Sequence, residues 1–170
     1  TANLAGRIES YTCGGQVFVS ETTAALVEAP LQVGERETIL PKGVAHALTL
    51  LEVTGLGPPH DLRLPRRIDN WQRPPGDPVV RWRSLEDKAV DTVPRTATLL
   101  RFSERGAWLR ASEPPARRAN LRLSPEEGTD TNGHSPPPPS HLYAKVIEIT
   151  GEAFRIRWSQ PRPTWLGDGR

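Results

Sequence analysis

The chain of 170 residues has little of several residue types, and each shortage excludes a class of protein. The single cysteine, Cys13, allows no internal disulfide and fits a reducing compartment. The four histidines and this cysteine show no ligand spacing, so we predict no metal site built by the chain itself. No apolar run is long enough to cross a bilayer, and no apolar segment follows a basic start as in a signal peptide.

Methionine is also absent, and the first residue is Thr1. Because translation begins with methionine, we expect either processing or an origin in a longer protein. Proline and glycine, in contrast, are abundant, with 18 and 14 residues. This content indicates several loops or linkers.

Charge is distributed unevenly along the chain. Residues 1–60 carry 3 basic and 6 acidic groups, residues 61–124 carry 14 and 8, and residues 125–170 carry 5 and 6. The change near residue 60 indicates a domain boundary. The basic middle is mostly arginine, which suits contact with anions, although a solvated arginine-rich surface has the same composition.

The N-terminal segment shows the pattern of an α-β-α-β-β unit. Leu4, Ile8 and Tyr11 recur at helical spacing, which predicts a helix over residues 3–11 with Asn3 as its cap. After Gly14-Gly15 we expect a strand at 16–20, a helix at 22–27, and a hairpin of strands 31–40 and 47–53.

The rest of the chain reads as a linker followed by β-structure. Residues 58–78 hold six prolines and many arginines, which indicates an extended linker or arm. Short strands are then predicted at 79–82, 95–102, 107–110, 119–123, 142–149 and 153–158, a pattern typical of a small barrel or sandwich. Residues 125–140 are of low complexity and read as a disordered insertion. We expect Trp82, Trp108 and Trp158 in the core.

The run Asn3-Leu4-Ala5-Gly6-Arg7, followed by Gly14-Gly15 and a strand ending in Ser20, resembles the signature of class III adenylate/guanylate cyclases. The segments Leu40–Val44 and Leu48–Val53 are similar to the closing hairpin of that family. The resemblance covers residues 1–56 and implies the C-terminal part of a ferredoxin-like α/β sandwich.

This resemblance implies roles for three residues. Asn3 would orient the ribose of ATP or GTP, and Arg7 would stabilise the charge that develops on the α-phosphoryl group. Lys42 would hold the terminal phosphates. The alternatives are a helix cap for Asn3, a surface ion pair with Glu9 or Glu37 for Arg7, and a solvated turn for Lys42.

The metal-binding half of the cyclase site is missing from the chain. In the family, two aspartates upstream of the asparagine hold Mg or Mn, and each site forms between the two subunits of a dimer. We therefore expect the chain alone to be inactive and to bind no metal, while the full-length parent forms a homodimer, makes a cyclic nucleotide and acts in intracellular signal transduction. The parent would be cytoplasmic, or anchored to a membrane by an upstream segment.

The segment Arg101-Phe102-Ser103-Glu104-Arg105-Gly106 resembles the Asp/Asn-x-Ser-x-x-Gly turn of PilZ domains, many of which bind cyclic di-GMP on a small β-barrel. This family also uses an Arg-x-x-x-Arg arm, and that spacing occurs at Arg63 and Arg67. Arg101 stands where the family has Asp or Asn, which removes an acceptor for guanine. The PilZ-like part of the chain is therefore interpreted either as a degenerate accessory barrel or as a binding module.

The sequence as a whole predicts an α+β protein in three parts. These are a partial cyclase domain at 1–56, a Pro/Arg-rich linker at 57–78 and a PilZ-like β-barrel at 79–165. The first functional hypothesis is a cyclase fragment. The alternative is a non-catalytic module for cyclic di-GMP or another anion that uses Arg63, Arg67, Ser103 and Gly106. Nucleic-acid binding by the basic middle is a third, less favoured hypothesis.

Overall fold

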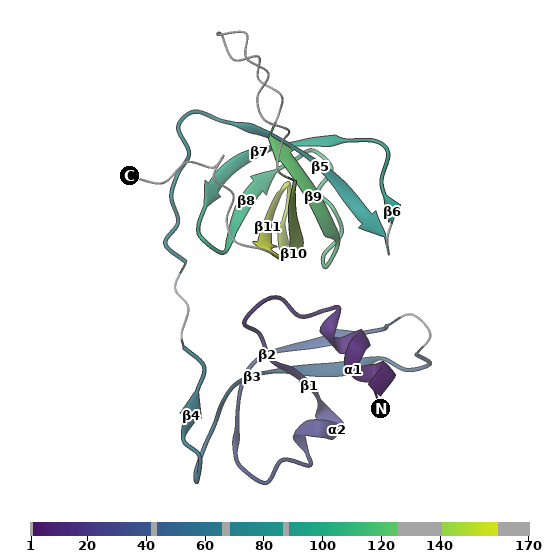
Figure 1. Cartoon of the computed structure of the whole chain (residues 1–170), viewed down its shortest axis with the longest axis vertical. Coiled ribbons are helices and arrows are strands. Elements are labelled where there is room, and N and C mark those ends of the chain that lie inside the picture. The colour runs from purple at the N-terminus through teal and green to yellow at the C-terminus, as the bar shows by residue number, and fades with distance from the viewer. Residues whose placement is uncertain (1, 42–43, 66–68, 87–88, 126–140, 160–170) are drawn as a thin grey trace. The chain divides into compact units, whose positions relative to one another are not determined.

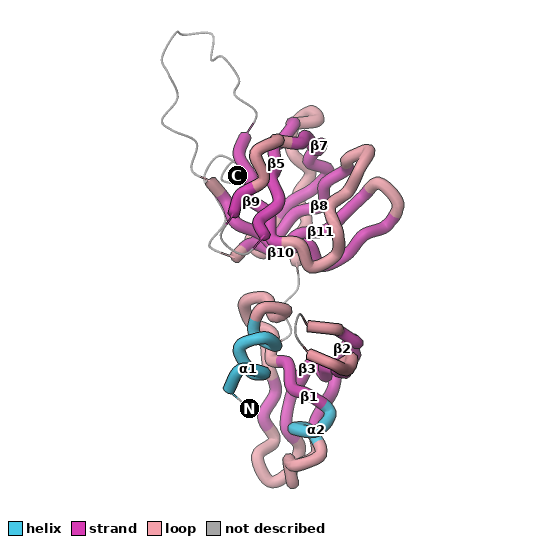
Figure 2. Tube along the Cα trace, turned by 90° about the vertical axis from the view of Figure 1, so that its right-hand side faces the viewer, coloured by secondary structure: helices cyan, strands magenta, loops and turns pink. Residues whose placement is uncertain are grey.

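The structure is a computed structural model that describes residues 2–41, 44–65, 69–86, 89–125 and 141–159. The chain divides into two compact units, Thr1–Arg67 and Ile68–Arg170. The division falls within the segment 57–78 that the sequence marks as a linker. Figures 1 and 2 show a first unit with both helices and a second unit built of strands.

Unit 1 is a small antiparallel sheet with two short helices. Its elements are α1 (Ala2–Glu9), β1 (Phe18–Ser20), α2 (Glu21–Ala24), β2 (Leu31–Ile39), β3 (Leu48–Leu56) and β4 (Leu62–Arg63). The strand order is β1-β3-β2, and β4 pairs with the end of β3. The predicted α-β-α-β-β order is confirmed, and β4 is an element that the sequence analysis missed.

The core of unit 1 fixes α1 on the sheet. Phe18, Ile39 and Leu50 are buried, and Ile8 and Tyr11 from the region of α1 pack against them. The predicted cap at Asn3 is wrong, because the helix already begins at Ala2. The second cap is confirmed, since the backbone N–H of Thr23 donates to Ser20 Oγ at 3.1 Å.

Strand β2 does not pair evenly with β3. Val33 lies opposite Val53, whereas the next registered pair is Arg36 opposite Leu51. Two residues of β2, Gly34 and Glu35, therefore stand outside the ladder where β3 has only one residue. Such a bulge bends the strand and strengthens its local twist.

Unit 2 contains a closed antiparallel barrel. Its strands are β5 (Val79–Glu86), β6 (Ala89–Val90), β7 (Arg95–Phe102), β8 (Gly106–Arg110), β9 (Asn120–Pro125), β10 (Leu142–Thr150) and β11 (Ala153–Trp158). The order β5-β7-β8-β11-β10-β9 closes because β9 also pairs with β5, and β6 only extends the end of β5. The prediction of a small β-barrel in this part of the chain is confirmed. All six predicted strands are present.

Alternation of apolar and polar residues determines which side chains fill the barrel. On β11, Phe154, Ile156 and Trp158 point inward and are buried, while the arginines between them lie outside. Trp82 is 1 % exposed and meets Phe154 edge to face, with 6.3 Å between ring centroids. The expectation that Trp108 belongs to this core is wrong. Its neighbours Ala107 and Leu109 point inward, so Trp108 lies half-buried on the outer surface.

Candidate functional site

Arg7 lies in the last turn of α1, on a different side of the helix from the residues that pack on the sheet. Ile8 faces the core of unit 1, and the neighbouring Arg7 side chain is exposed. Among the described residues the Arg7 guanidinium makes no ion pair, so neither Glu9 nor Glu37 holds it. The guanidinium is thus available to an external anion.

The other predicted cyclase and arm residues are placed only in part. Asn3 lies within α1, four residues before Arg7, but its side chain is outside the described residues, as are Lys42 and Arg67. Arg63 is exposed on β4, where it pairs with Gly55 of β3. It therefore belongs to unit 1, whereas Ser103 and Gly106 belong to unit 2.

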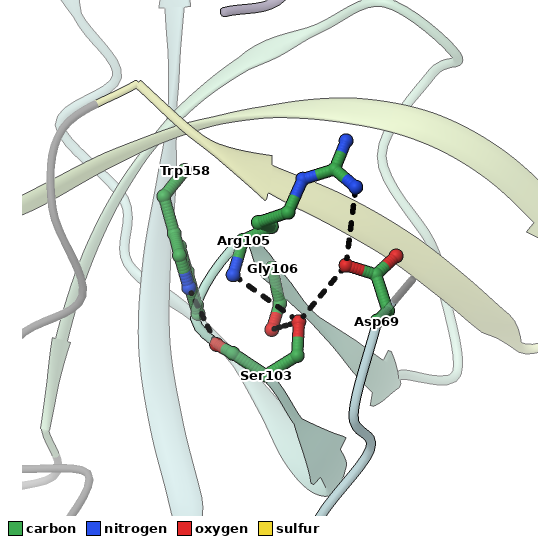
Figure 3. A network of polar contacts seen from close by, with 5 residues as sticks. All are labelled: Asp69, Ser103, Arg105, Gly106 and Trp158. Atoms are coloured by element: carbon green, nitrogen blue, oxygen red, sulfur yellow. Dashed lines mark hydrogen bonds and ion pairs between the residues drawn. The ribbon is translucent and has the colours of Figure 1, made fainter. Parts of the chain in front are cut away.

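Ser103 and Gly106 form the tight turn between β7 and β8 (Figure 3). Ser103 is 3 % exposed, and its Oγ accepts a hydrogen bond from the backbone N–H of Arg105 at 3.2 Å. The backbone N–H of Ser103 donates to Gly106 O at 2.8 Å, and Trp158 Nε1 donates to Ser103 O at 3.3 Å. These contacts close the turn and attach it to β11.

A carboxylate from the preceding segment also reaches this turn. Asp69 Oδ1 lies 3.4 Å from Ser103 Oγ, which can donate to it, and 3.7 Å from a terminal nitrogen of Arg105 (Figure 3). Gln72 holds the same segment in place, because it exchanges two backbone hydrogen bonds with Phe102, at 2.8 and 2.9 Å. We call residues 69–72 the docked arm. The turn therefore carries an anion from its own chain.

Arg101, the residue at the position that the PilZ resemblance assigns to Asp or Asn, contacts two indole rings. Its guanidinium carbon is 5.9 Å from the centroid of Trp71 and 5.5 Å from that of Trp108. Arg155 approaches Trp108 as well, at 5.9 Å, and pairs with Glu148 at 3.2 Å. Cation–π contacts of this kind stabilise the docked arm on the outer face of β7 and β8.

Gly106 is required by the packing of the barrel. A Cβ at this position would collide with the carbonyl oxygen of Ile156 and stand 3.1 Å from its carbonyl carbon. Gly106 is the register partner of Arg157, so a side chain here would separate β8 from β11. The glycine of this turn thus serves the fold whatever the turn binds.

Two participants in this site escaped the sequence analysis. Asp69 and Trp71 lie in the proline- and arginine-rich stretch, where no periodicity marks a residue as a contact. The residues 2–41, 44–65, 69–86, 89–125 and 141–159 include no group of three or more His, Cys, Asp or Glu side chains that could hold a metal ion.

Comparison with known proteins assigns the chain to no family, so the functional interpretation depends on the geometry of the site. No protein-family model matches the chain, and no curated protein matches it in sequence. In the described ranges, no helix is both long and apolar enough to span a membrane.

Proposed function

We propose that unit 1 is the C-terminal part of a class III nucleotidyl cyclase catalytic domain and supplies the asparagine–arginine half of its site. The observation that carries this proposal is the position of Arg7. It is exposed at the end of α1, while a neighbouring side of the helix packs on a sheet whose elements follow in the order β1-α2-β2-β3. This is the element order that the resemblance implies.

The proposed reaction is the cyclisation of a nucleoside triphosphate. The ribose 3′-hydroxyl gives up its proton to water as its oxygen attacks the α-phosphorus, and the bond from that phosphorus to the oxygen of the departing pyrophosphate breaks. Negative charge grows on the phosphoryl oxygens during this step, and a fixed guanidinium stabilises it. Arg7 would take this role, Asn3 would orient the ribose and Lys42 would contact the terminal phosphates. The divalent ions would be held by residues outside this chain, so the chain alone is inactive.

The test is cyclase activity in a protein that joins this chain to a metal-binding cyclase half. Replacing Arg7 by Ala should lower turnover by about a hundredfold or more. Arg36→Ala is the matched control, because Arg36 is an exposed arginine of the same unit whose recorded ion pair is with Glu21 at 3.6 Å. Equal turnover of the Arg7 variant and the control would refute the assignment.

A second candidate function is anion binding at the β7–β8 turn of the barrel, with cyclic di-GMP as the ligand that the PilZ resemblance implies. One observation favours it, namely that the docked arm ends on the turn and places a carboxylate at Ser103 and Arg105. Asp69 would compete with the ligand for these donors. Calorimetric titration with cyclic di-GMP should therefore give tighter binding for Asp69→Asn than for the original chain. Absence of heat in both proteins would end this candidate.

A further inference from the structure

A row of side chains crosses the outer face of the barrel over β5, β9 and β10, which lie side by side (Figure 1). Trp82, Leu121 and Leu142 fill the interior, so the residues next to them in the chain point outward. In register, Arg83 stands directly opposite Arg122, and Arg122 stands opposite Tyr143. We call Arg83, Arg122 and Tyr143 the outer arginine row.

Two arginines in this arrangement need an explanation, because like charges directly opposite each other destabilise a sheet. Among the described residues, neither guanidinium is in an ion pair with a carboxylate. The recorded contact of Arg83 is a 3.4 Å hydrogen bond from one terminal nitrogen to the backbone oxygen of Asp91. Arg122 Nε is buried and has no hydrogen-bond partner in the part of the chain that is described. Because Arg122 Nε is shielded from solvent, the donors of Arg122 that remain for a ligand are those of its terminal guanidinium nitrogens.

The nearby His141 feels the positive charge of both guanidiniums. Burial lowers the pKa of His141, and the positive charges of Arg122 and Arg83 lower it further. His141 immediately precedes β10, two residues before Tyr143. Two residues further along β10, Lys145 stands opposite Arg157 and is buried, at 9 % exposed.

We infer that the outer arginine row binds the phosphoryl group of a small ligand. Arginine forks match phosphate oxygens in pairs of hydrogen bonds, and two opposed forks can hold one phosphoryl group from both sides. Tyr143 is 41 % exposed at the edge of the row and offers a hydroxyl donor.

A nucleic acid fits this face less well, because it needs a continuous track of cations. Three other arginines of unit 2 are engaged with their own chain. Arg95 pairs with Asp91 at 3.6 Å, and Arg105 pairs with Asp69. Arg101 contacts Trp71 and Trp108.

The test is calorimetric titration of the full chain with inorganic phosphate and with adenosine 5′-monophosphate, at constant ionic strength. Arg122→Gln and Arg83→Gln should each weaken binding by about tenfold or more, as expected for loss of charged hydrogen bonds. Arg110→Gln is the matched control, because Arg110 is exposed on β8 and its loss removes the same charge. Tighter binding of the nucleotide would point to a nucleotide ligand, and equal binding to free phosphate.

Several results would overturn the proposal. One is an equal loss of affinity in Arg110→Gln, which would show a general charge effect. Another is absence of binding at about 10 mM of either probe. A third is binding of duplex DNA that depends on Arg83 and Arg122 and is tighter than that of both small probes. Far-UV circular dichroism checks that each variant is folded. Arg122→Lys, which keeps the charge and loses the fork, should lie between the original chain and Arg122→Gln.

Discussion

Asp69 and Ser103 are 34 residues apart in the chain, yet the carboxylate oxygen of the first lies 3.4 Å from the hydroxyl oxygen of the second. The same carboxylate pairs with Arg105, and both side chains of this pair are partly buried. The contact attaches the segment that enters unit 2 to the β7–β8 turn. It links the stability of the docked arm to the electrostatics of the turn.

Removal of this carboxylate should loosen the arm. We expect Asp69→Ala to lower the free energy of unfolding of unit 2 by about 1 kcal/mol, because a partly buried ion pair and a hydrogen bond are lost. Urea denaturation followed by tryptophan fluorescence measures the change. Asp77→Ala, at an exposed position of the same unit, should have no comparable effect. Equal stability of the Asp69 variant and the original chain would show that the contact contributes nothing.

Loss of the Arg101 guanidinium should release Trp71. Arg101→Ala removes two cation–π contacts, and each of them contributes about 0.5–1 kcal/mol to stability. We expect faster chymotrypsin cleavage after Trp71 in the arm and a shift of tryptophan emission to longer wavelength. Arg110→Ala serves as the control. If adding Trp71→Phe to the Arg101→Ala variant abolishes the emission shift, the signal comes from the arm. An Arg101 variant that is cleaved as slowly as the control would contradict this role.

Substitution of Gly106 should damage the barrel itself. Gly106→Ala forces a methyl group against the carbonyl of Ile156, and overpacking of this kind costs about 1–3 kcal/mol. Thermal unfolding followed by circular dichroism should show a lower Tm. Gly151→Asn is the comparison in the β10–β11 turn, where φ is +59° and asparagine tolerates that conformation. A Tm of Gly106→Ala equal to that of the original chain would mean that β8 and β11 can move apart without cost.

The titration of His141 should report on the outer arginine row. Its pKa in the folded chain lies below the ordinary value of 6.5 because of burial and the charges of Arg122 and Arg83. The unfolded chain therefore binds the proton more readily, and this residue makes the fold less stable as the pH falls below 6.5. NMR titration, assigned with His141→Gln, should show the pKa rising in Arg122→Gln. If the pKa of His141 does not rise in Arg122→Gln, then His141 does not sense the charge of the outer arginine row.

Much of the fold follows from local patterns in the sequence. Strands 95–102 and 153–158 were predicted with the bounds that the structure gives, because apolar and polar residues alternate clearly there. The short helix α2 was predicted too long, since it ends at Ala24 and the following residues turn away before Pro30. β4 and β6 have two residues each and pair only because tertiary contacts bring them to β3 and β5.

The candidate site was predicted less completely than the fold. Ser103 and Gly106 could be singled out because their spacing resembles a known turn. Asp69 and the rings around Arg101 could not, because a contact across 34 residues leaves no periodic trace in the chain. Trp108 was placed on the wrong side of its strand by its hydrophobicity, whereas the alternation of Ala107 and Leu109 assigns it to the surface.

The bulge of β2 has a consequence for how the chain behaves at high concentration. The barrel pairs each of its six strands on both sides and so offers no open backbone edge, whereas β2 ends the described sheet of unit 1. An open edge invites another chain to add a strand, and bulges and charges suppress this. Gly34 and Glu35 interrupt the ladder at the middle of β2, and Arg36 adds a second exposed charge. We therefore expect unit 1 to resist edge-to-edge aggregation although its sheet is open.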